Sequence, residues 1–185
     1  MKILLTAILS LLIFTGCSDG KPIKTTKVTQ EKQSTPELKK DANNIILKDT
    51  TGKEIKVTIL KDGFKFEGYE NKIILLNFFA TWCPPCKAEI PHLNNLQEKY
   101  KDDIKIISIL LEENKSNEDV IKFMNKNAIE FTITNSNANF DMAREVGGVR
   151  RIPFMIIYDR NGKYSQHYRG AVLEEMIDAD IQKVL

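Results

Sequence analysis

The sequence is short of the residues that build fibrous, disulfide-rich and nucleic-acid-binding proteins. Its 185 residues include only nine glycines and six prolines, which excludes a fibrous repeat. Three cysteines are too few for a disulfide scaffold. The 27 basic and 25 acidic side chains leave a net charge of +2, which gives no case for a nucleic-acid partner. At 42% hydrophobic residues the chain is nevertheless too apolar to be disordered, and we expect one folded domain with a short appendage.

The apolar run at the N-terminus is also short. Residues 3–14 (ILLTAILSLLIF) carry no charge, and as a helix they would rise about 18 Å, less than the ~30 Å hydrocarbon core of a membrane. A lysine before the run and small residues after it are typical of a secretory signal peptide. We therefore expect residues 1–16 to be cleaved and the protein to be exported.

The first cysteine, Cys17, directly follows this segment. Residues 14–17 (FTGC) resemble the lipobox of bacterial lipoproteins, in which cleavage precedes a cysteine that carries a lipid thioether. Phe14 departs from that pattern, where an aliphatic residue is usual. The resemblance implies that Cys17 is lipidated and anchors the protein to a membrane. The alternative is an ordinary signal peptide whose Cys17 stays a free thiol or is removed.

Residues 17–42 hold little apolar surface. They have no aromatic side chain, and their large aliphatic side chains are only Ile23, Val28 and Leu38. Such a segment cannot bury enough apolar surface to offset the entropy lost on ordering. We expect it to be a flexible tether that connects the anchor to a folded domain of residues 43–185.

Strand and helix patterns alternate within that domain. Apolar runs and short β-branched segments predict strands at residues 45–47, 55–59, 73–79, 104–111, 131–133, 154–158 and 164–168. Apolar side chains at helical spacing predict helices at residues 84–100, 117–127, 140–146 and 173–184. Turn residues at 49–52 and 159–162 predict that the flanking strands form hairpins. Together these elements predict a three-layer α/β domain with an N-terminal β-hairpin.

Cys83 and Cys86 lie where the strand at 73–79 gives way to the helix at 84–100. A Cys-x-x-Cys in a βα context is typical of a redox-active dithiol. A helix start presents free N–H groups and the positive end of the helix dipole, and both favour a thiolate. We expect Cys83 to be the exposed N-cap residue, with the amides of Cys86 and Lys87 as its nearest donors.

Two other uses of this cysteine pair are less consistent with the sequence. A zinc site would need further ligands, but there is no second Cys-x-x-Cys and only His92 and His167 remain as nitrogen ligands. A purely structural disulfide that closes so small a loop would add little stability. We therefore expect no metal and no cofactor other than the redox-active Cys83–Cys86 disulfide.

The segment around the dithiol resembles a known family. Residues 77–91 (NFFATWCPPCKAEIP) are similar to the active-site segment of the thioredoxin superfamily, and in particular of the TlpA/ResA-like membrane-tethered thiol-disulfide oxidoreductases of bacteria. The resemblance implies a thioredoxin-like fold, with a central mixed sheet flanked by helices and an αβ insertion at residues 112–139. It also implies that Pro153 follows a cis bond, in a loop that faces the dithiol and pairs with the substrate backbone through Ile152, and that Pro91 kinks the helix.

One departure from thioredoxin concerns proton transfer. Asn77 stands where thioredoxin has a buried aspartate, and an amide cannot carry the proton. Glu89 lies three residues after Cys86, on nearly the same helix face, where the TlpA/ResA-like branch typically has an acid. We expect Glu89 to be partly buried, to have a raised pKa and to exchange protons with Cys86. The alternative is a solvated helix glutamate.

Four other conspicuous side chains receive smaller roles. We expect Trp82 to pack at the mouth of the site and to shape contact with a partner. Arg150 and Arg151 lie next to the predicted cis-proline loop, where they could recognise an acidic partner, but we interpret them as a solvated charge pair. His92 is interpreted as a surface histidine without a catalytic role.

These features predict an exported, membrane-anchored thiol-disulfide oxidoreductase that faces the periplasm or another extracytoplasmic side. The Cys83 thiolate attacks a partner disulfide, and Cys86 resolves the mixed disulfide. The resemblance implies the reducing direction, protein thiol or disulfide substrates, a membrane thiol-disulfide protein as electron donor, and a part in cytochrome c maturation with apocytochrome c as substrate. We expect a monomer.

Three alternatives remain open. An oxidising, disulfide-forming catalyst shares the motif but usually carries a larger helical insertion. A peroxiredoxin-like peroxidase would have a threonine three residues before its cysteine, whereas Thr81 is two residues before Cys83. A redox-inactive binding lipoprotein would not need the intact cysteine pair.

Overall fold

The computed structural model of the chain describes residues 43–185. The predicted signal peptide, the predicted lipidation site Cys17 and the predicted tether lie outside the described residues. No helix in the described part of the chain is long and apolar enough to cross a membrane.

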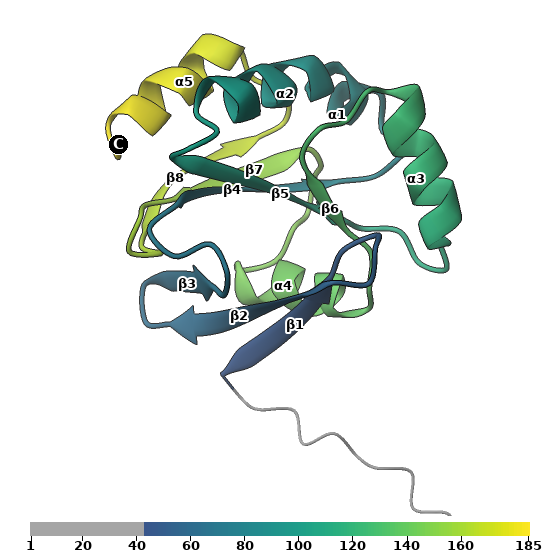
Figure 1. Cartoon of the computed structure of the whole chain (residues 1–185), viewed down its shortest axis with the longest axis horizontal. Coiled ribbons are helices and arrows are strands. Elements are labelled where there is room, and N and C mark those ends of the chain that lie inside the picture. The colour runs from purple at the N-terminus through teal and green to yellow at the C-terminus, as the bar shows by residue number, and fades with distance from the viewer. Residues whose placement is uncertain (1–42) are drawn as a thin grey trace, which may run out of the picture. The chain divides into compact units, whose positions relative to one another are not determined.

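Five strands form the central sheet, in the order β6-β5-β4-β7-β8 (Figure 1). The middle strand β4 (Ile73–Phe79) pairs parallel with β5 (Ile104–Leu110) and antiparallel with β7 (Phe154–Tyr158). β6 (Thr132–Thr134) extends the sheet in parallel beyond β5, and β8 (Tyr164–Arg169) extends it in antiparallel beyond β7. Every residue of β4 is buried, as expected for an apolar strand that is covered on both faces.

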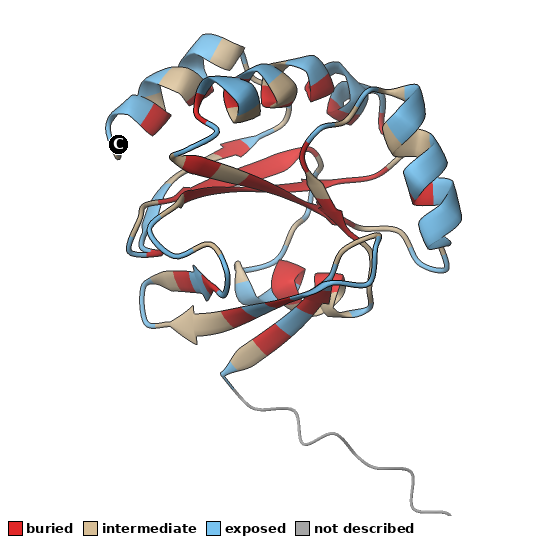
Figure 2. Cartoon of the chain, in the orientation of Figure 1, coloured by how far each residue is buried: buried red, intermediate tan, exposed pale blue. Residues whose placement is uncertain are grey.

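Three helices cover one face of this sheet. They are α2 (Ile90–Lys99), α3 (Asn117–Lys126) and α5 (Glu174–Gln182), and their buried apolar side chains form one cluster with those of β4 and β5. Figure 2 shows the buried residues concentrated in the central sheet and on parts of the helices above it. The predicted αβ insertion at 112–139 is present as α3 and β6.

The predicted helix at 84–100 is two helices. A short α1 (Pro84–Ala88) ends at Glu89, and α2 begins at the next residue. Pro91 stands in the first turn of α2 and has no N–H to donate to the preceding turn, so the helical hydrogen bonds cannot run through this point. The break places Glu89 between the two helices.

A second, three-stranded antiparallel sheet and helix α4 (Ala138–Glu145) cover the other face. The sheet consists of β1 (Asn44–Lys48), β2 (Glu54–Leu60) and β3 (Gly63–Phe66), in that order. The β1–β2 hairpin is as predicted, whereas β3, only four residues long, was not predicted. Side chains from this layer form a second hydrophobic cluster with the opposite face of β4, β5 and β7. The three-layer mixed α/β fold predicted from the sequence is thus confirmed.

The two sheets are joined by their backbones at the turn between β7 and β8. The Phe64 N–H donates to the Gly162 carbonyl at 2.8 Å, and the Tyr164 N–H donates to the Asp62 carbonyl at 3.0 Å. Gly162 has a φ of +78°, and a Cβ at this position would lie 2.1 Å from the Phe64 oxygen. Only glycine fits this contact.

Candidate active site

Cys83 and Cys86 form a disulfide where the polypeptide passes from β4 into α1. Their Cα atoms are 5.3 Å apart. Cys83 is the N-cap residue of α1, and Pro84 and Pro85 occupy the first turn, where a missing N–H costs no helical hydrogen bond. The dithiol therefore follows the carboxyl end of a strand that is buried along its whole length.

One backbone amide reaches the Cys83 sulfur. The Cys86 N–H donates to Cys83 Sγ at 3.3 Å, whereas the Lys87 N–H donates to the Cys83 carbonyl at 3.2 Å. Of the two predicted donors, only the first therefore contacts the sulfur. An N–H group at a helix start stabilises negative charge, so this geometry favours a thiolate at Cys83 once the disulfide is reduced.

The prediction that Cys83 is exposed was wrong. Cys83 is 3% exposed and Cys86 is 5% exposed, because the two sulfurs are bonded to each other and lie in the hydrophobic cluster beneath α1 and α2. The neighbouring Trp82 is 66% exposed. A molecule that approaches the dithiol therefore meets a large exposed aromatic ring beside it, in keeping with the position predicted for Trp82.

Glu89 is buried one turn after Cys86, at the junction of α1 and α2. It is 2% exposed, and its Oε1 atom accepts a hydrogen bond from the Val172 N–H at 2.7 Å. Burial raises the pKa of the Glu89 carboxyl, and the Val172 N–H and the nearby His92 offset part of that rise. The predicted burial and the direction of the pKa shift are confirmed, and the proton exchange with Cys86 stays a prediction.

His92 contacts this carboxyl. Its Nδ1 atom lies 3.6 Å from Glu89 Oε2, while its side chain is 38% exposed. The sequence interpretation gave His92 no role at the site. The available signal was its spacing, because residues three apart in a helix lie on the same side.

The Ile152–Pro153 bond is cis, as the family resemblance implied. β7 begins at the next residue, Phe154, which stands opposite Phe78 of β4. Since β4 leads to Cys83, the proline loop lies at the same edge of the sheet as the dithiol. Ile152 packs against both hydrophobic clusters, including the one that contains the two cysteines.

A glutamate that the sequence did not single out supports the loop before the dithiol. Glu112 Oε1 accepts a hydrogen bond from the Thr81 N–H, and Glu112 Oε2 lies 3.5 Å from Lys115 Nζ. Glu112 follows β5, the parallel neighbour of β4, and carboxyl ends of parallel strands meet at one sheet edge. Its position shortly after β5 was the only indication in the sequence that Glu112 lies near the dithiol.

Asn77, at the aspartate position of thioredoxin, is buried beneath the site. Its Nδ2 donates to Ser108 Oγ at 3.0 Å, so the side chain is tied to β5. In the described part of the chain, no three His, Cys, Asp or Glu side chains are grouped so as to hold a metal ion. The expectation that the protein uses no metal or cofactor stays a prediction.

Comparisons with known proteins agree with this geometry. The family model described as Redoxin matches residues 18–185. Thiol-disulfide oxidoreductase ResA of Bacillus subtilis (strain 168) is 31% identical over 141 residues, which cover 74% of this chain and 70% of that protein. The protein of the same name from Bacillus thuringiensis subsp. konkukian (strain 97-27) is 29% identical over 157 residues, covering 83% and 82%.

Solved structures share the fold at lower identity. A putative thiol:disulfide interchange protein DsbE from Chlorobium tepidum superposes with a TM-score of 0.62 at 24% identity, over 77% of this chain and 94% of that chain. StoA from Bacillus subtilis superposes with a TM-score of 0.58 at 20% identity, over 75% and 96%.

Proposed function

The chain belongs to the redoxin family and is a thiol-disulfide oxidoreductase of the thioredoxin superfamily, and from this premise we propose that it reduces protein disulfides with the Cys83–Cys86 dithiol. The observation that carries the proposal is the disulfide at the start of α1, beside an exposed tryptophan and at the same sheet edge as the cis-proline loop. A purely structural bridge would need none of these neighbours.

The reaction begins with the reduced dithiol. The Cys83 thiolate, supported by the Cys86 N–H, attacks one sulfur of the partner disulfide, and the other partner sulfur leaves as a thiolate and takes up a proton. Cys86 then loses its proton and attacks Cys83 Sγ, which releases the second partner thiolate. Two electrons have passed to the partner, and the protein is left with the Cys83–Cys86 disulfide.

Glu89 is the proposed acceptor of the Cys86 proton. It lies one turn along the chain from Cys86, it is buried, and its raised pKa makes it a better base for a thiol than an ordinary carboxylate. The Val172 N–H holds the carboxyl in place. In the reverse direction the same carboxyl returns the proton when the disulfide is reduced again.

Trp82 and Ile152 are the proposed substrate contacts. Trp82 presents an apolar surface next to the dithiol, and Ile152 offers backbone groups in the loop before Pro153. The substrate would be a protein whose cysteines must be kept reduced, and apocytochrome c before haem attachment is the substrate that the family resemblance suggests. A membrane thiol-disulfide protein would return electrons to the oxidised dithiol.

We also propose that the protein acts outside the cytoplasm, on a lipid anchor at Cys17. The signal-peptide pattern of residues 1–16 and the FTGC sequence support this location. Membrane fractionation of cells that express Cys17→Ala tests it. We expect the variant to leave the membrane fraction, and unchanged membrane retention would argue against lipidation.

A cysteine-trapping experiment tests the reaction itself. Mixed with an oxidised protein substrate, Cys86→Ser should stop at a covalent mixed disulfide that dithiothreitol cleaves, because nothing resolves it. Cys83→Ser should form no such adduct and should lose the reductase activity. A Cys83→Ser protein as competent as the unmodified one would end the proposal.

A further inference from the structure

A cavity at the active-site edge of the sheet is lined by three arginines. It has a volume of about 520 Å³. Arg150 and Arg151 come from the loop between α4 and β7, Arg169 comes from the end of β8, and the Phe154 ring lies among them. The sequence left an acidic partner as the alternative to a solvated pair for Arg150 and Arg151, and the structure brings a third arginine to them from another strand.

The cavity adjoins the loop that carries the cis-proline. Phe154 directly follows Pro153 and stands opposite Phe78 of β4 and Arg169 of β8. It belongs to the hydrophobic cluster on the α4 side of the sheet, whereas the two cysteines belong to the other cluster. A polypeptide bound at the proline loop can therefore continue over the arginine cavity without covering the dithiol.

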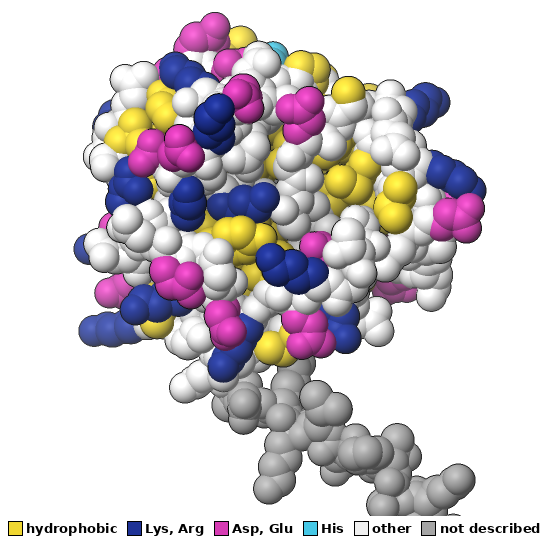
Figure 3. Space-filling view, in the orientation of Figure 1, with side chains coloured by type: hydrophobic (Ala, Val, Ile, Leu, Met, Phe, Trp, Pro, Cys, Tyr) yellow, Lys and Arg dark blue, Asp and Glu magenta, His cyan; other side chains and the backbone are white. Residues whose placement is uncertain are grey.

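The three guanidinium groups have no acidic partner within residues 43–185. The one contact seen for them there is that of Arg169, which lies 5.9 Å from the centre of the Phe154 ring. The other two arginines of the chain each pair with an aspartate: Arg144 with Asp141, and Arg160 with Asp103. Figure 3 shows basic and acidic side chains interspersed over the face that it draws. A cavity whose charged lining residues are all arginines is an exception to that mixture.

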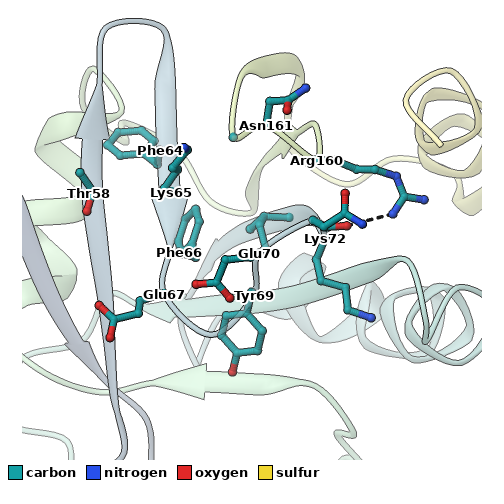
Figure 4. Close-up of a pocket in the computed structure, with 13 residues that line it drawn as sticks. Thr58, Phe64, Lys65, Phe66, Glu67, Tyr69, Glu70, Lys72, Arg160 and Asn161 are labelled. Atoms are coloured by element: carbon teal, nitrogen blue, oxygen red, sulfur yellow. Dashed lines mark hydrogen bonds between the residues drawn. The ribbon is translucent and has the colours of Figure 1, made fainter.

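A second cavity provides a contrast. It has a volume of about 330 Å³ and lies near the start of β4, at the end of the strand away from the dithiol (Figure 4). Its arginine, Arg160, donates to the Asn71 carbonyl at 2.9 Å and to Asp103 Oδ1 at 2.6 Å. Its Lys72 donates to the Asp102 carbonyl. Arg160 and Lys72 thus hold the fold together, and Glu67 and Glu70 line the same cavity with Lys65, whereas the lining of the arginine cavity contains no acidic residue.

The backbone of the arginine loop is fixed at both ends. At its start, Gly147 and Gly148 have φ values of +92° and +90°. The Gly148 N–H donates to the Ala143 carbonyl at 3.0 Å, and this hydrogen bond closes the C-terminal end of α4. At its far end, the Pro153 carbonyl accepts a hydrogen bond from the Gly170 N–H at 2.8 Å. Arg150 and Arg151 therefore belong to a loop whose two ends are held, and Arg169 belongs to β8.

We propose that the arginine cavity binds an acidic segment of the protein whose disulfide is exchanged. This proposal rests on the function proposed above and specifies the partner. Guanidinium groups bind carboxylates through paired hydrogen bonds, and three of them that form no ion pair in the described part of the chain present a concentrated positive surface. Because Phe154 of the cavity and the two cysteines belong to clusters on opposite faces of the sheet, the contact strengthens docking and leaves the exchange chemistry unchanged.

Two disulfide-bridged peptides test the proposal. They differ only in three residues next to one cysteine, which are aspartates in one peptide and asparagines in the other. We expect pre-reduced protein to reduce the acidic peptide about tenfold faster at low concentration, with the same rate at saturation, and we expect added salt to shrink the difference. A cysteine-free copy of the acidic peptide should bind to the oxidised protein, with its affinity measured by calorimetry.

Two variants with equal charge changes locate the effect. In R150Q/R151Q/R169Q the preference for the acidic peptide and the binding of the cysteine-free peptide should be lost, while the neutral peptide is reduced at the unmodified rate. The lysines changed in K56Q/K61Q/K126Q are exposed and outside the cavity. In this variant the preference for the acidic peptide and the binding of the cysteine-free peptide should remain. R150Q/R151Q keeps the Arg169 contact with Phe154 and should lose part of the preference.

Three results would overturn the proposal. They are equal rates for the two peptides with the unmodified protein, an equal loss of preference in the lysine variant, and an unchanged preference in the arginine variants. If neither peptide is reduced, the proposed function itself fails. In that case the cysteine-free peptide decides about the site. If it still binds and the arginine substitutions abolish its binding, the arginine cavity remains a binding site for acidic segments and only the proposed reductase function is wrong.

Discussion

The Oε2 atom of Glu89 lies 3.6 Å from the Nδ1 atom of His92, and neither atom has a hydrogen-bond partner within residues 43–185. A proton between these two atoms would satisfy both. The carboxyl is buried, whereas the imidazole side chain is partly exposed. The pair therefore offers a route for protons between the neighbourhood of Cys86 and the solvent, and this relationship leads to the first three predictions.

Glu89→Gln should slow the step in which Cys86 resolves the mixed disulfide. Gln keeps an oxygen for the Val172 N–H but cannot take up the thiol proton. We expect a loss of about 10-fold to 100-fold in the exchange rate near neutral pH, in the range of general-base effects, and a changed pH profile. Stopped-flow Trp82 fluorescence can follow the step. Glu98→Gln, on the exposed side of α2, is the control, and a Glu89→Gln profile identical to the unmodified one would remove Glu89 from the mechanism.

His92→Ala should raise the pKa of Glu89 further, because the charge of the nearby imidazole lowers it. The pH at which the exchange rate changes should therefore move upward, while the dithiol stays intact. Infrared spectroscopy of the carboxyl band across a pH series measures the pKa directly. An unshifted carboxyl titration would show that the 3.6 Å contact has no electrostatic effect.

The contribution of Glu89 to the stability of the oxidised protein should decrease as the pH rises. A salt-bridged acid has the opposite effect. Burial raises the pKa of Glu89 in the folded state, so the folded protein holds this proton more tightly than the unfolded chain. The contribution of Glu89 is complete below its ordinary pKa of 4.5 and is lost as the pH rises through the raised value. Glu89→Gln should match the unmodified protein at low pH and exceed it in urea-unfolding stability at neutral pH. A constant difference across the pH range would contradict this.

Gly162→Ala should destabilise the joint between the two sheets by about 3 kcal/mol or more. The new Cβ would meet the Phe64 carbonyl at 2.1 Å, and the φ of +78° adds strain. Gly52→Ala is the matched control, because Gly52 has a similar φ of +88° but nothing within 4 Å of the added Cβ, so that about 1 kcal/mol is expected. Equal losses in urea unfolding would show that the close contact between the sheets contributes nothing.

The sequence predicted those elements whose pattern is local. The apolar run of residues 73–79 is β4 and the run of 154–158 is β7, with the same bounds, because strands buried on both faces are continuously apolar. The helix predicted at 84–100 is broken beside Pro91, where the family resemblance implied a kink; helical periodicity continues across this proline although the hydrogen bonds do not.

The sequence predicted only those residues of the candidate site that belong to a recognisable local motif. The dithiol, Glu89 and the proline loop were found because neighbouring residues mark them. Three features of the site depend on the order of the strands in the sheet, which spacing along the chain does not give. They are the burial of Cys83, the hydrogen bond between Thr81 and Glu112, and the position of Arg169 beside two earlier arginines.

The reduction potential of the Cys83–Cys86 couple tests the central claim most directly. It can be measured by equilibrating the protein with glutathione or dithiothreitol buffers and following Trp82 fluorescence. A reductant of protein disulfides should have a potential at or below roughly −250 mV, as thioredoxin does. A value near about −120 mV, typical of a strongly oxidising catalyst, would contradict the reducing role.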